Sequence, residues 1–504
     1  MPSASSVSAS SSLFTAHPFR WFLALLAVLF FYREWIVIST PITLFYDEAY
    51  YLGWAQTLDW GYYSKPPMVG WLIALTTSLF GNAEWAVKLA APVLYSGAAI
   101  IIYRTAEYLS GSRAALISGA VFLLMPLVGF NSLFITTDAP LIFFWCLCFY
   151  AFLQAKDTNN GLWWLLAGVA GGLGLLSKYT FIILPSTFLL YAALSPVGRQ
   201  LLLNPRFWFT CLLALSFLLP NLYWNYQHDF ISFQHTAQIS HQNSSSISLS
   251  RLLEFWGGQL FVFSPVLLVY MLLRGMRRQP RSETEKLLWS LFWPTFAVLS
   301  IQALMAKANV NWAGPAYVGA SLLTGYYLSQ VKGYRLLLIG LFANLLLSMS
   351  FYHYGVVTDA LGIERKAGTD PYKRLLGWPE FVHQFQPWFD EYPDYKLASD
   401  SRKLLAYFGY YITPQDFKGV ALSDDSYIEN HYELQYPLSN SPAKQFLFVS
   451  EHDAQAKLMR YFSDVTLLTE QVYPLYSNFS RTARLYKVSG FKGIPQEATQ
   501  QNHE

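Results

Sequence analysis

Two adjacent carboxylates stand among aromatic residues in the stretch YDEAYYLGWAQTLDWGYYSKPPM, residues 46–68, which follows a strongly apolar segment. On a helix that begins here, Asp47 shares a face with residues three, four and seven positions later. Glu48 points about 100° away. A carboxylate beside flat aromatic rings suits sugar binding, because the rings stack on the sugar while the acid binds a hydroxyl group. The candidate sugar-lining residues are Tyr50, Tyr51, Trp54 and Tyr62.

The end of the same stretch adds a cation in a restricted backbone. Pro66 and Pro67 each fix their own φ, and a proline pushes the residue before it toward extended geometry. Lys65 is therefore held in a defined pose, where it can pair with a lipid-carried phosphate as a point charge. Two plainer interpretations stay open. The lysine snorkels among lipid headgroups, or the whole stretch is an interfacial aromatic belt with a solvated acidic pair.

Three more polar residues stand beside or between apolar segments later in the chain. Asp138, in TTDAP, is either a functional carboxylate or the N-cap of the following helix. Lys178, in LSKYT, separates two apolar runs that leave almost no loop, so it is a second phosphate contact or a snorkelling side chain. His228 lies in a polar loop whose histidine spacings are not those of a zinc site, and a hydrogen-bonding loop histidine is its plainer reading. We predict no metal-ligating residues from these patterns.

The composition determines the environment of these residues. Of 504 residues, 54% are hydrophobic and only 13% are charged, whereas a soluble domain averages roughly 25% charged residues. The chain is therefore predicted to lie in a lipid bilayer. A net charge of +3, without a basic run that carries interleaved aromatics, argues against nucleic acid as a partner. The cysteines lie in apolar segments and are expected to be small core or lipid-facing residues: Cys146, Cys148 and Cys211.

Apolar segments long enough to cross a bilayer, which takes about 20 residues, number about eleven. The sequence thus predicts an α-helical polytopic membrane protein with a transmembrane domain over 21–357, after a Ser-rich, disordered, cytoplasmic stretch at 1–20. We interpret the first segment as a retained transmembrane helix, not a removed signal peptide. The predicted spans lie near 21–41, 84–103, 114–133, 139–155, 162–177, 180–195, 207–224, 255–273, 287–305, 313–330 and 334–356.

Lysine and arginine placement predicts the orientation, because cytoplasmic loops are enriched in these residues. With the N-terminus inside, the inside loops carry many basic residues and the outside loops few. An odd number of spans then places the C-terminus outside. The opening loop at 42–83, the turn with Asp138, the polar loop with His228 and the tail from about 358 would share the extracytoplasmic face.

The tail, residues 358–504, is rich in charge and holds no apolar span. The segments FLFVS at 446–450 and ARLYKV at 483–488 alternate as strands do, and SRKLLAYFGYY at 401–411 is typical of a helix. We expect a small extracytoplasmic α/β domain.

Five motifs occur in one order along the chain: DEAYY, GYYSKPP, TTDAPL, LSKYT and WNYQHDF. Together they resemble the bacterial glycosyltransferase family 39 group, over roughly residues 20–330. This group belongs to the C-type superfamily of polytopic transferases that use polyprenyl-phosphate sugars, and includes relatives of the protein O-mannosyltransferases and of the aminoarabinose transferase of lipid A. The resemblance implies the C-type glycosyltransferase fold in a bacterial inner membrane.

The resemblance also implies roles for three residues of this chain. Asp47 matches the catalytic acidic position, Lys65 a lysine that contacts the carrier phosphate, and Asp138 a second carboxylate near the sugar or acceptor. We accordingly predict both Asp47 and Asp138 to be catalytic. One position departs from the pattern. Ser64 stands where the aminoarabinose transferases typically have a glutamate that helps to bind a metal ion, so no cofactor is assigned and a divalent cation remains an option. The stretch NVNWAGPAY at 309–317 resembles a late outer-loop motif and receives no role.

The implied reaction moves a sugar from a polyprenyl-phosphate donor to an envelope acceptor, which is a glycolipid such as lipid A, a glycan or a protein. Asp47 would act as general base, a contribution of about 10²–10⁴-fold. Lys65, with Lys178, would stabilise the leaving phosphate, and direct displacement inverts the anomeric centre. Glu48 and His228 complete the expected substrate-binding set. The alternative class is a polytopic transporter or lipid-linked sugar flippase, which typically shows broken helices and an internal repeat.

Overall fold

The computed structural model describes residues 17–241, 247–277, 280–423 and 427–493. The chain divides into two compact units. Unit 1 comprises residues up to 38, the short segment 65–69 and residues 88–354. Unit 2 comprises residues 39–64, 70–87 and the chain from 355 onward. Each unit is described by itself below.

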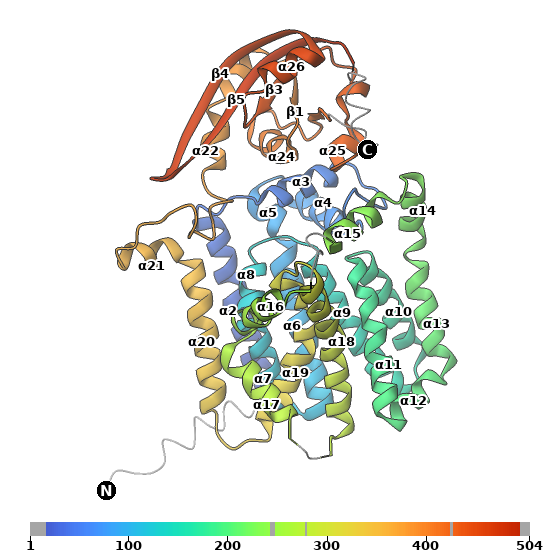
Figure 1. Cartoon of the computed structure of the whole chain (residues 1–504). Coiled ribbons are helices and arrows are strands. Elements are labelled where there is room, and N and C mark those ends of the chain that lie inside the picture. Colours follow the sequence, from blue (N-terminus) through green and yellow to red (C-terminus); the bar gives the residue numbers. More distant parts are fainter. Residues whose placement is uncertain (1–16, 242–246, 278–279, 424–426, 494–504) are drawn as a thin grey trace. The chain divides into compact units, whose positions relative to one another are not determined.

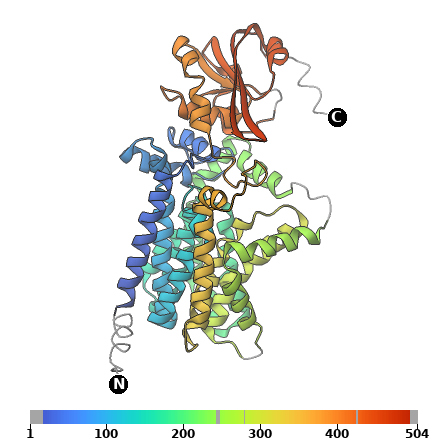
Figure 2. The same ribbon diagram turned by 90° about the vertical axis from the view of Figure 1, so that its left-hand side faces the viewer.

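Unit 1 is helical, and its long helices run roughly parallel in both views (Figures 1 and 2). Every predicted apolar segment falls on helix. The elements are α2 (Pro18–Ser39), α6 (Ala90–Ser110), α7 (Ser112–Leu124), α8 (Pro126–Asn131), α9 (Asp138–Thr158), α10 (Gly161–Leu175), η1 (Tyr179–Ile183), α11 (Leu184–Leu194), α12 (Pro196–Leu202), α13 (Pro205–Ser216), α14 (Leu219–Gln227), α15 (Ile231–His241), α16 (Leu249–Val262), α17 (Pro265–Gly275), α18 (Glu283–Met305), η2 (Val310–Ala313), α19 (Ala316–Ser329) and α20 (Arg335–Tyr352).

Six of the described helical segments are long and apolar enough to cross a membrane, and a bent pair makes up to seven. Three of the other predicted spans correspond to shorter apolar helices, and the one at 313–330 corresponds to α19, so the count of about eleven stays a prediction. The segment predicted as one span at 255–273 is instead the bent pair, α16 and α17, at 111° to each other. The cause lies in the sequence, because the Ser264 side chain accepts the N–H of Leu267 and Pro265 starts a new helix.

A second proline break is stabilised by a buried arginine. Pro126 has no N–H to donate, so α7 ends and α8 begins there. The guanidinium of Arg33, on α2, donates to the carbonyl oxygen of Leu123 at 2.6 Å and to the Tyr352 hydroxyl at 3.2 Å. Arg33 therefore joins three helices of unit 1 by hydrogen bonds.

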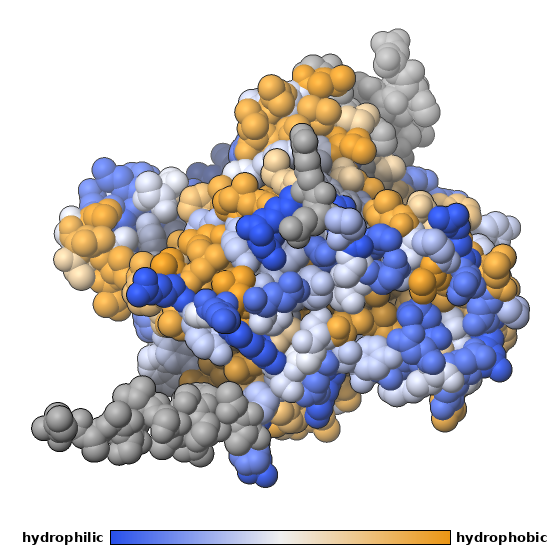
Figure 3. All heavy atoms as spheres, turned by 90° about the horizontal axis from the view of Figure 1, so that it is seen from below, coloured by the Kyte–Doolittle hydropathy of each residue, from blue (hydrophilic) through white to orange (hydrophobic). Residues whose placement is uncertain are grey.

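The predicted cytoplasmic loops meet at one end of unit 1. Arg113 donates to the carbonyl oxygen of Val331 at 2.8 Å, and Arg206 donates to that of Asn159. Figure 3 looks at unit 1 from this end, where hydrophilic side chains spread between hydrophobic patches. The basic residues of these loops and helix ends are Arg104, Arg113, Lys156, Arg199, Arg206, Arg274, Arg281, Lys286, Lys332 and Arg335.

Unit 2 contains a five-stranded mixed sheet with the strand order β2-β1-β3-β5-β4. Strand β1 pairs in parallel with β2 and β3, and β5 pairs antiparallel with β3 and β4. The tail predictions are confirmed, since 446–450 and 483–488 lie in strands and 402–411 is a helix. The strands are β1 (Lys396–Ser399), β2 (Val420–Ala421), β3 (Gln445–Ser450), β4 (Phe462–Tyr476) and β5 (Phe479–Phe491).

The helices of unit 2 come from two distant parts of the chain. The opening loop forms α3 (Tyr46–Ala55), α4 (Met68–Phe80) and α5 (Glu84–Lys88). The tail forms α22 (Trp378–His383), α23 (Gln386–Glu391), α24 (Arg402–Tyr411), α25 (His431–Gln435) and α26 (Gln455–Tyr461), with the short α21 (Tyr354–Ala360) before them.

The opening loop packs with the tail, although the predicted domain boundaries separated the two. The Tyr407 hydroxyl of α24 donates to the carbonyl oxygen of Leu44 at 3.2 Å, and the Tyr411 hydroxyl donates to Glu84 at 2.7 Å. The compact unit is consequently larger than the predicted domain at 358–504. The stretch that carries Asp47 thus belongs to the same unit as the sheet.

Candidate active site

Glu48 closes the start of α3. Its carboxylate accepts the N–H of Phe45 at 2.9 Å, and its side chain is buried. A glutamate at the third helical position that accepts the N-cap N–H is one half of a capping box. The structure thus gives Glu48 a role in the helix start, and substrate binding by Glu48 stays a prediction.

Asp47 lies at the start of α3 and is partly exposed. Its carboxylate pairs with the guanidinium of Arg402, the first residue of α24, at 3.8 Å between Oδ1 and Nη2. The guanidinium also lies over the rings of Tyr46 and Tyr50, at 5.3 and 5.5 Å from their centroids. Burial lowers the pKa of Arg402, but the charge of Asp47 raises it, and the net shift is upward. Asp47 is therefore held beside a permanent cation.

The aromatic residues predicted to line a sugar are buried in unit 2. Trp54 stacks on Tyr62 with ring centroids 4.6 Å apart and an interplanar angle of 7°, and His431 lies edge-on to both rings. Burial raises the pKa of Tyr62 to about 12, so its hydroxyl stays protonated, 3.2 Å from the carbonyl oxygen of Trp54. Tyr50 packs on Tyr432 of α25. The exposed fractions are 2% for Tyr50, 6% for Tyr51, 1% for Trp54 and 1% for Tyr62.

This packing gives the aromatic residues a structural role, and sugar binding by them stays a prediction. The ring faces that α3 presents contact other protein side chains, because the tail supplies partners that the opening loop could not reveal. The partly exposed part of this site is the pair of Asp47 and Arg402, with side chains 31% and 35% exposed.

A second polar site lies in unit 1, at the end where α9 begins and α10 ends. The ammonium of Lys178 pairs with Asp138 at 2.7 Å, and the Asn311 amide donates to the other carboxylate oxygen at 3.0 Å. Asp138 is the first residue of α9, and the N-cap position belongs to Thr137, whose side chain makes no capping hydrogen bond. The Thr136 hydroxyl accepts the N–H of Asp138 at 3.2 Å. The carboxylate of Asp138 is thus turned to Lys178 and Asn311, and the predicted N-cap role is wrong.

Asn311 was not predicted as a site residue, since its motif NVNWAGPAY received no role from the sequence. The motif places η2 beside α9, and its amide completes the surroundings of Asp138. A nearby group joins two other motifs, since the Tyr179 hydroxyl donates to Asn221 at 3.0 Å and Asn225 donates to the Tyr179 hydroxyl at 3.4 Å. The order of the motifs in the sequence indicated that these residues lie near one another. It did not indicate which atoms form the hydrogen bonds.

Lys65 belongs to unit 1 and is partly exposed. The segment 65–69 is attached to the end of α10, because the N–H of Met68 donates to the carbonyl oxygen of Leu176 at 3.1 Å. Leu176 comes just before Lys178 in the chain. The two predicted phosphate-contacting lysines therefore stand on segments that are hydrogen bonded to each other.

His228 takes the plainer role that its sequence context favoured. Its Nδ1 lies 2.8 Å from the carbonyl oxygen of Trp224, and its ring stacks on Trp224 at 4.1 Å. Both residues belong to the end of α14, where Asp229 and Phe230 adopt positive φ. His228 thus contributes to the end of this helix, and its place in the substrate-binding set stays a prediction.

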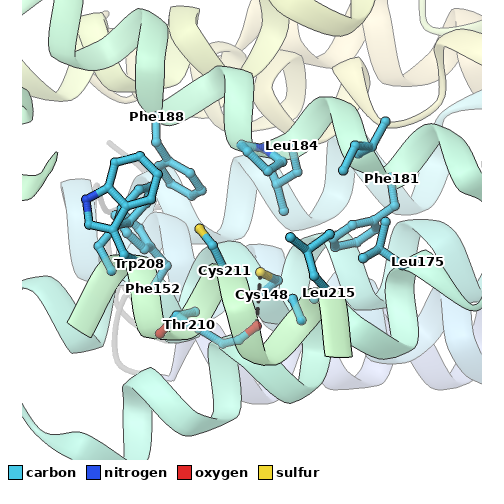
Figure 4. A pocket seen from close by; sticks show the side chains of 16 residues that line it. Cys148, Phe152, Leu175, Phe181, Leu184, Phe188, Trp208, Thr210, Cys211 and Leu215 are labelled. Carbon is cyan, nitrogen blue, oxygen red and sulfur yellow. Dashed lines mark hydrogen bonds between the residues drawn. The ribbon is translucent and has the colours of Figure 1, made fainter. Parts of the chain in front are cut away.

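An apolar pocket of about 260 Å³ lies among the helices of unit 1 (Figure 4). It is formed by α9, α10, η1, α11 and α13, and two of its residues, Leu175 and Phe181, flank Lys178 in the chain. The cysteines behave as small apolar residues, since Cys146 and Cys148 are buried and Cys211 lines the pocket. Figure 4 labels ten of the lining residues.

Within the described ranges, no three His, Cys, Asp or Glu side chains lie close enough together to hold a metal ion. Ser64, which replaces the metal-binding glutamate of the aminoarabinose transferases, is buried. Its hydroxyl adds no charge to the site.

The lipid A galacturonosyltransferase RgtD of Rhizobium johnstonii is 31% identical to this chain over 415 residues, which is 81% of this chain and 86% of RgtD. The chain belongs to glycosyltransferase family 39. A family model described as dolichyl-phosphate-mannose-protein mannosyltransferase matches residues 64–224. This member of family 39 is consequently a membrane glycosyltransferase.

Two further comparisons extend this result. An undecaprenyl phosphate-alpha-4-amino-4-deoxy-L-arabinose arabinosyl transferase of Sodalis glossinidius is 26% identical over 251 residues, 44% of each chain. The crystal structure of ArnT from Cupriavidus metallidurans bound to undecaprenyl phosphate superposes with a TM-score of 0.62 at 15% identity, over 92% of this chain and 97% of ArnT. The family 39 member thus has the ArnT-like C-type fold, with its apolar helices and small C-terminal sheet.

Proposed function

We propose that this protein transfers a sugar from a polyprenyl-phosphate carrier to lipid A or a related envelope glycolipid, with inversion, at the outer face of a bacterial inner membrane. The observation that carries the proposal is the partly exposed carboxylate of Asp47, held beside Arg402 at the start of α3. The long match to a lipid A galacturonosyltransferase supports the acceptor, and the fold match to ArnT supports the arrangement of helices around such a reaction.

The chemistry assigned to Asp47 is general base catalysis. The hydroxyl oxygen of the acceptor attacks the anomeric carbon and forms the new glycosidic bond. The bond from that carbon to the carrier phosphate breaks, and its electron pair leaves with the phosphate oxygen. Asp47 takes the proton of the attacking hydroxyl, which adds about 10²–10⁴-fold to the rate.

The charge that develops on the carrier phosphate needs a cation. Lys65 is our candidate, because the proline-fixed segment 65–69 is anchored to the end of α10. Stabilisation of a developing anion by a positioned cation is commonly the largest single contribution to catalysis. Lys178 is already paired with Asp138, so we assign it a smaller share, as the residue that holds Asp138.

Asp138 is proposed to orient the acceptor or the sugar and not to act as a base. Its two oxygens accept from Lys178 and Asn311, and its side chain is 7% exposed. Both oxygens of this buried carboxylate already accept hydrogen bonds, which fixes the direction of the side chain.

The apolar chain of the donor is proposed to use the pocket beside Lys178. The pocket is almost wholly apolar, and its residues Leu175 and Phe181 precede and follow the lysine. Lipid tails are as apolar as the residues of this pocket, so a prenyl chain that enters it from the bilayer gains packing contacts and no transfer energy from water. The pocket would therefore recognise the long natural carrier by the fit of its first isoprene units.

The proposed orientation has the N-terminus in the cytoplasm and the tail outside. The basic loops that meet at one end of unit 1 support it, since cytoplasmic loops carry excess lysine and arginine. The two polar groups at the other end, Asp138 with Lys178 and the segment 65–69, would then face the extracytoplasmic side.

The test is release of the carrier. Purified protein in liposomes is given a polyprenyl-phosphate sugar with and without lipid A, and free polyprenyl phosphate and glycosylated lipid A are measured by mass spectrometry. We expect both products, in equal amounts, only when acceptor is present. Movement of the intact carrier across the bilayer without cleavage would show a flippase instead.

A further inference from the structure

We propose that Arg402 binds a carboxylate on the transferred sugar, so that this site selects a uronic acid over neutral and amino sugars. The proposal rests on the proposed function, because it names the sugar class that the same site accepts. Neither the family resemblance nor the sequence motifs drew attention to Arg402, which stands at the first position of α24 in the tail.

The guanidinium of Arg402 is only loosely paired with Asp47. Its Nη2 lies 3.8 Å from Oδ1 of Asp47, which is longer than a hydrogen bond. The neighbouring basic residues of the tail are tightly paired, Lys403 with Glu451 at 2.7 Å and Lys457 with Asp400 at 2.8 Å. An arginine carries five N–H donors in a planar fork. The contacts with Asp47 and with the Tyr46 hydroxyl leave other N–H groups of this fork able to take a second carboxylate.

Two aromatic rings on one side of the Arg402 guanidinium fix its position. The rings of Tyr46 and Tyr50 lie 5.3 and 5.5 Å from the guanidinium carbon, so cation–π attraction holds the charge over them. The Tyr50 ring is itself immobilised, because its hydroxyl accepts the N–H of His431 and its ring packs on Tyr432. A preorganised fork loses little side-chain entropy when it binds a ligand.

The charge pattern separates two sugar classes of opposite charge. A uronic acid brings a negative charge close to Asp47, and two carboxylates repel each other unless a cation lies between them. Arg402 provides that cation, and the charge of Arg374 also reaches Tyr46. An amino sugar brings a positive charge, which Asp47 alone would accommodate and which Arg402 repels. The galacturonosyl and aminoarabinosyl relatives therefore differ in the charge of the transferred sugar, which is the property that this site distinguishes.

The experiment compares three donors on one acceptor. Polyprenyl-phosphate galacturonate, its galactose counterpart with CH₂OH in place of the carboxylate, and the 4-amino-4-deoxyarabinose donor are each assayed with lipid A. The variants are Arg402→Met, which removes the charge, and Arg402→Lys, which keeps the charge but loses the fork. Lys403→Met is the matched control, because it removes a neighbouring charge that is paired with Glu451.

We expect the wild type and Lys403→Met to prefer galacturonate over galactose. Arg402→Met should lower kcat/KM for galacturonate about 10–100-fold, the range of a charge-assisted hydrogen bond, and change the galactose value far less. Arg402→Lys should fall between the two. The ratio of the two donors is the measurement that decides, because lost folding or a displaced Asp47 slows both donors alike.

Three results would contradict this proposal. An equal loss for galacturonate and galactose in Arg402→Met would make Arg402 a support for Asp47 only. A wild type that prefers the amino sugar would exclude carboxylate recognition, and so would a wild type that does not discriminate between galacturonate and galactose. In all three cases sugar transfer itself stands. Absence of carrier release from all three donors would instead overturn the proposed function.

Discussion

The molecule holds two aspartates in contrasting surroundings, one in each unit. Asp47 is 31% exposed and meets its cation at 3.8 Å, whereas Asp138 is 7% exposed and meets Lys178 at 2.7 Å and Asn311 at 3.0 Å. A proton acceptor must be reachable by its substrate and must have room for a new bond. A positioning group must instead keep one direction. We therefore propose, from the difference in exposure, that Asp47 is the proton acceptor and that Asp138 is the positioning group, although the sequence presents the two carboxylates as equals.

Asp47→Asn should produce the largest effect on turnover. The amide keeps the size of the side chain but cannot take a proton, so kcat should fall by about 10²–10⁴-fold. The substitution is at a partly exposed position, and the stability of the protein should change by no more than about 0.5 kcal/mol. Initial rates of polyprenyl phosphate release, with thermal unfolding in detergent as the control, measure both. Near-normal turnover would exclude Asp47 as the base.

Asp138→Asn should act on stability as well as activity. The substitution leaves the ammonium of Lys178 without its anion in a mostly buried place, which typically costs about 3–5 kcal/mol. Adding Lys178→Met to Asp138→Asn should recover much of the stability, because the lone charge is then removed. Thermal unfolding of the two single variants and the double variant forms the cycle. Additive losses in the double variant would show that the pair is not coupled.

The apolar segments and the strand alternation of the tail allowed most of the helices and strands to be predicted, because both patterns are local. The candidates Asp47, Lys65, Asp138 and Lys178 were also visible, since charge is rare in this chain. Their partners were not visible. Arg402 contacts Asp47, and Asn311 contacts Asp138, only because the chain folds. In the sequence each of these partners lies far from its aspartate.

The structural roles of residues in α3 could not be predicted for the same reason. The periodicity of α3 correctly placed Tyr50 and Trp54 on one side of a helix, but a buried face and a ligand-binding face have the same pattern. The tail covers that side, with Tyr432 against Tyr50 and His431 against Trp54. The capping role of Glu48 could not be predicted, because a capping box is usually identified from Ser or Thr at the N-cap, and here Phe45 stands at that position.

Glu48→Gln should distinguish the role of Glu48 from that of its neighbour Asp47. Glutamine can still accept the N–H of Phe45 through its amide oxygen, so turnover should stay within a few-fold of the wild type. Glu48→Ala removes the acceptor and should destabilise the protein by about 0.5–2 kcal/mol, as for other lost helix caps. Thermal unfolding and turnover of both variants are the measurements. A loss of turnover in Glu48→Gln as large as in Asp47→Asn would give Glu48 a role in the reaction.

The smallest expected effect concerns the apolar pocket of unit 1. Cys211 lines this pocket, and Cys211→Phe adds a ring to its space of about 260 Å³. If the prenyl chain of the donor occupies the pocket, KM should rise several-fold for the long natural carrier and stay unchanged for a donor with a two-isoprene chain, which is too short to fill it. Cys211→Val is the control for a change of side chain without a large change of volume. Equal KM shifts for long and short donors would mean that the ring disturbs the helices rather than the prenyl chain. In that case the carrier lies elsewhere, while the contrast between Asp47 and Asp138 is unaffected because neither aspartate lines the pocket.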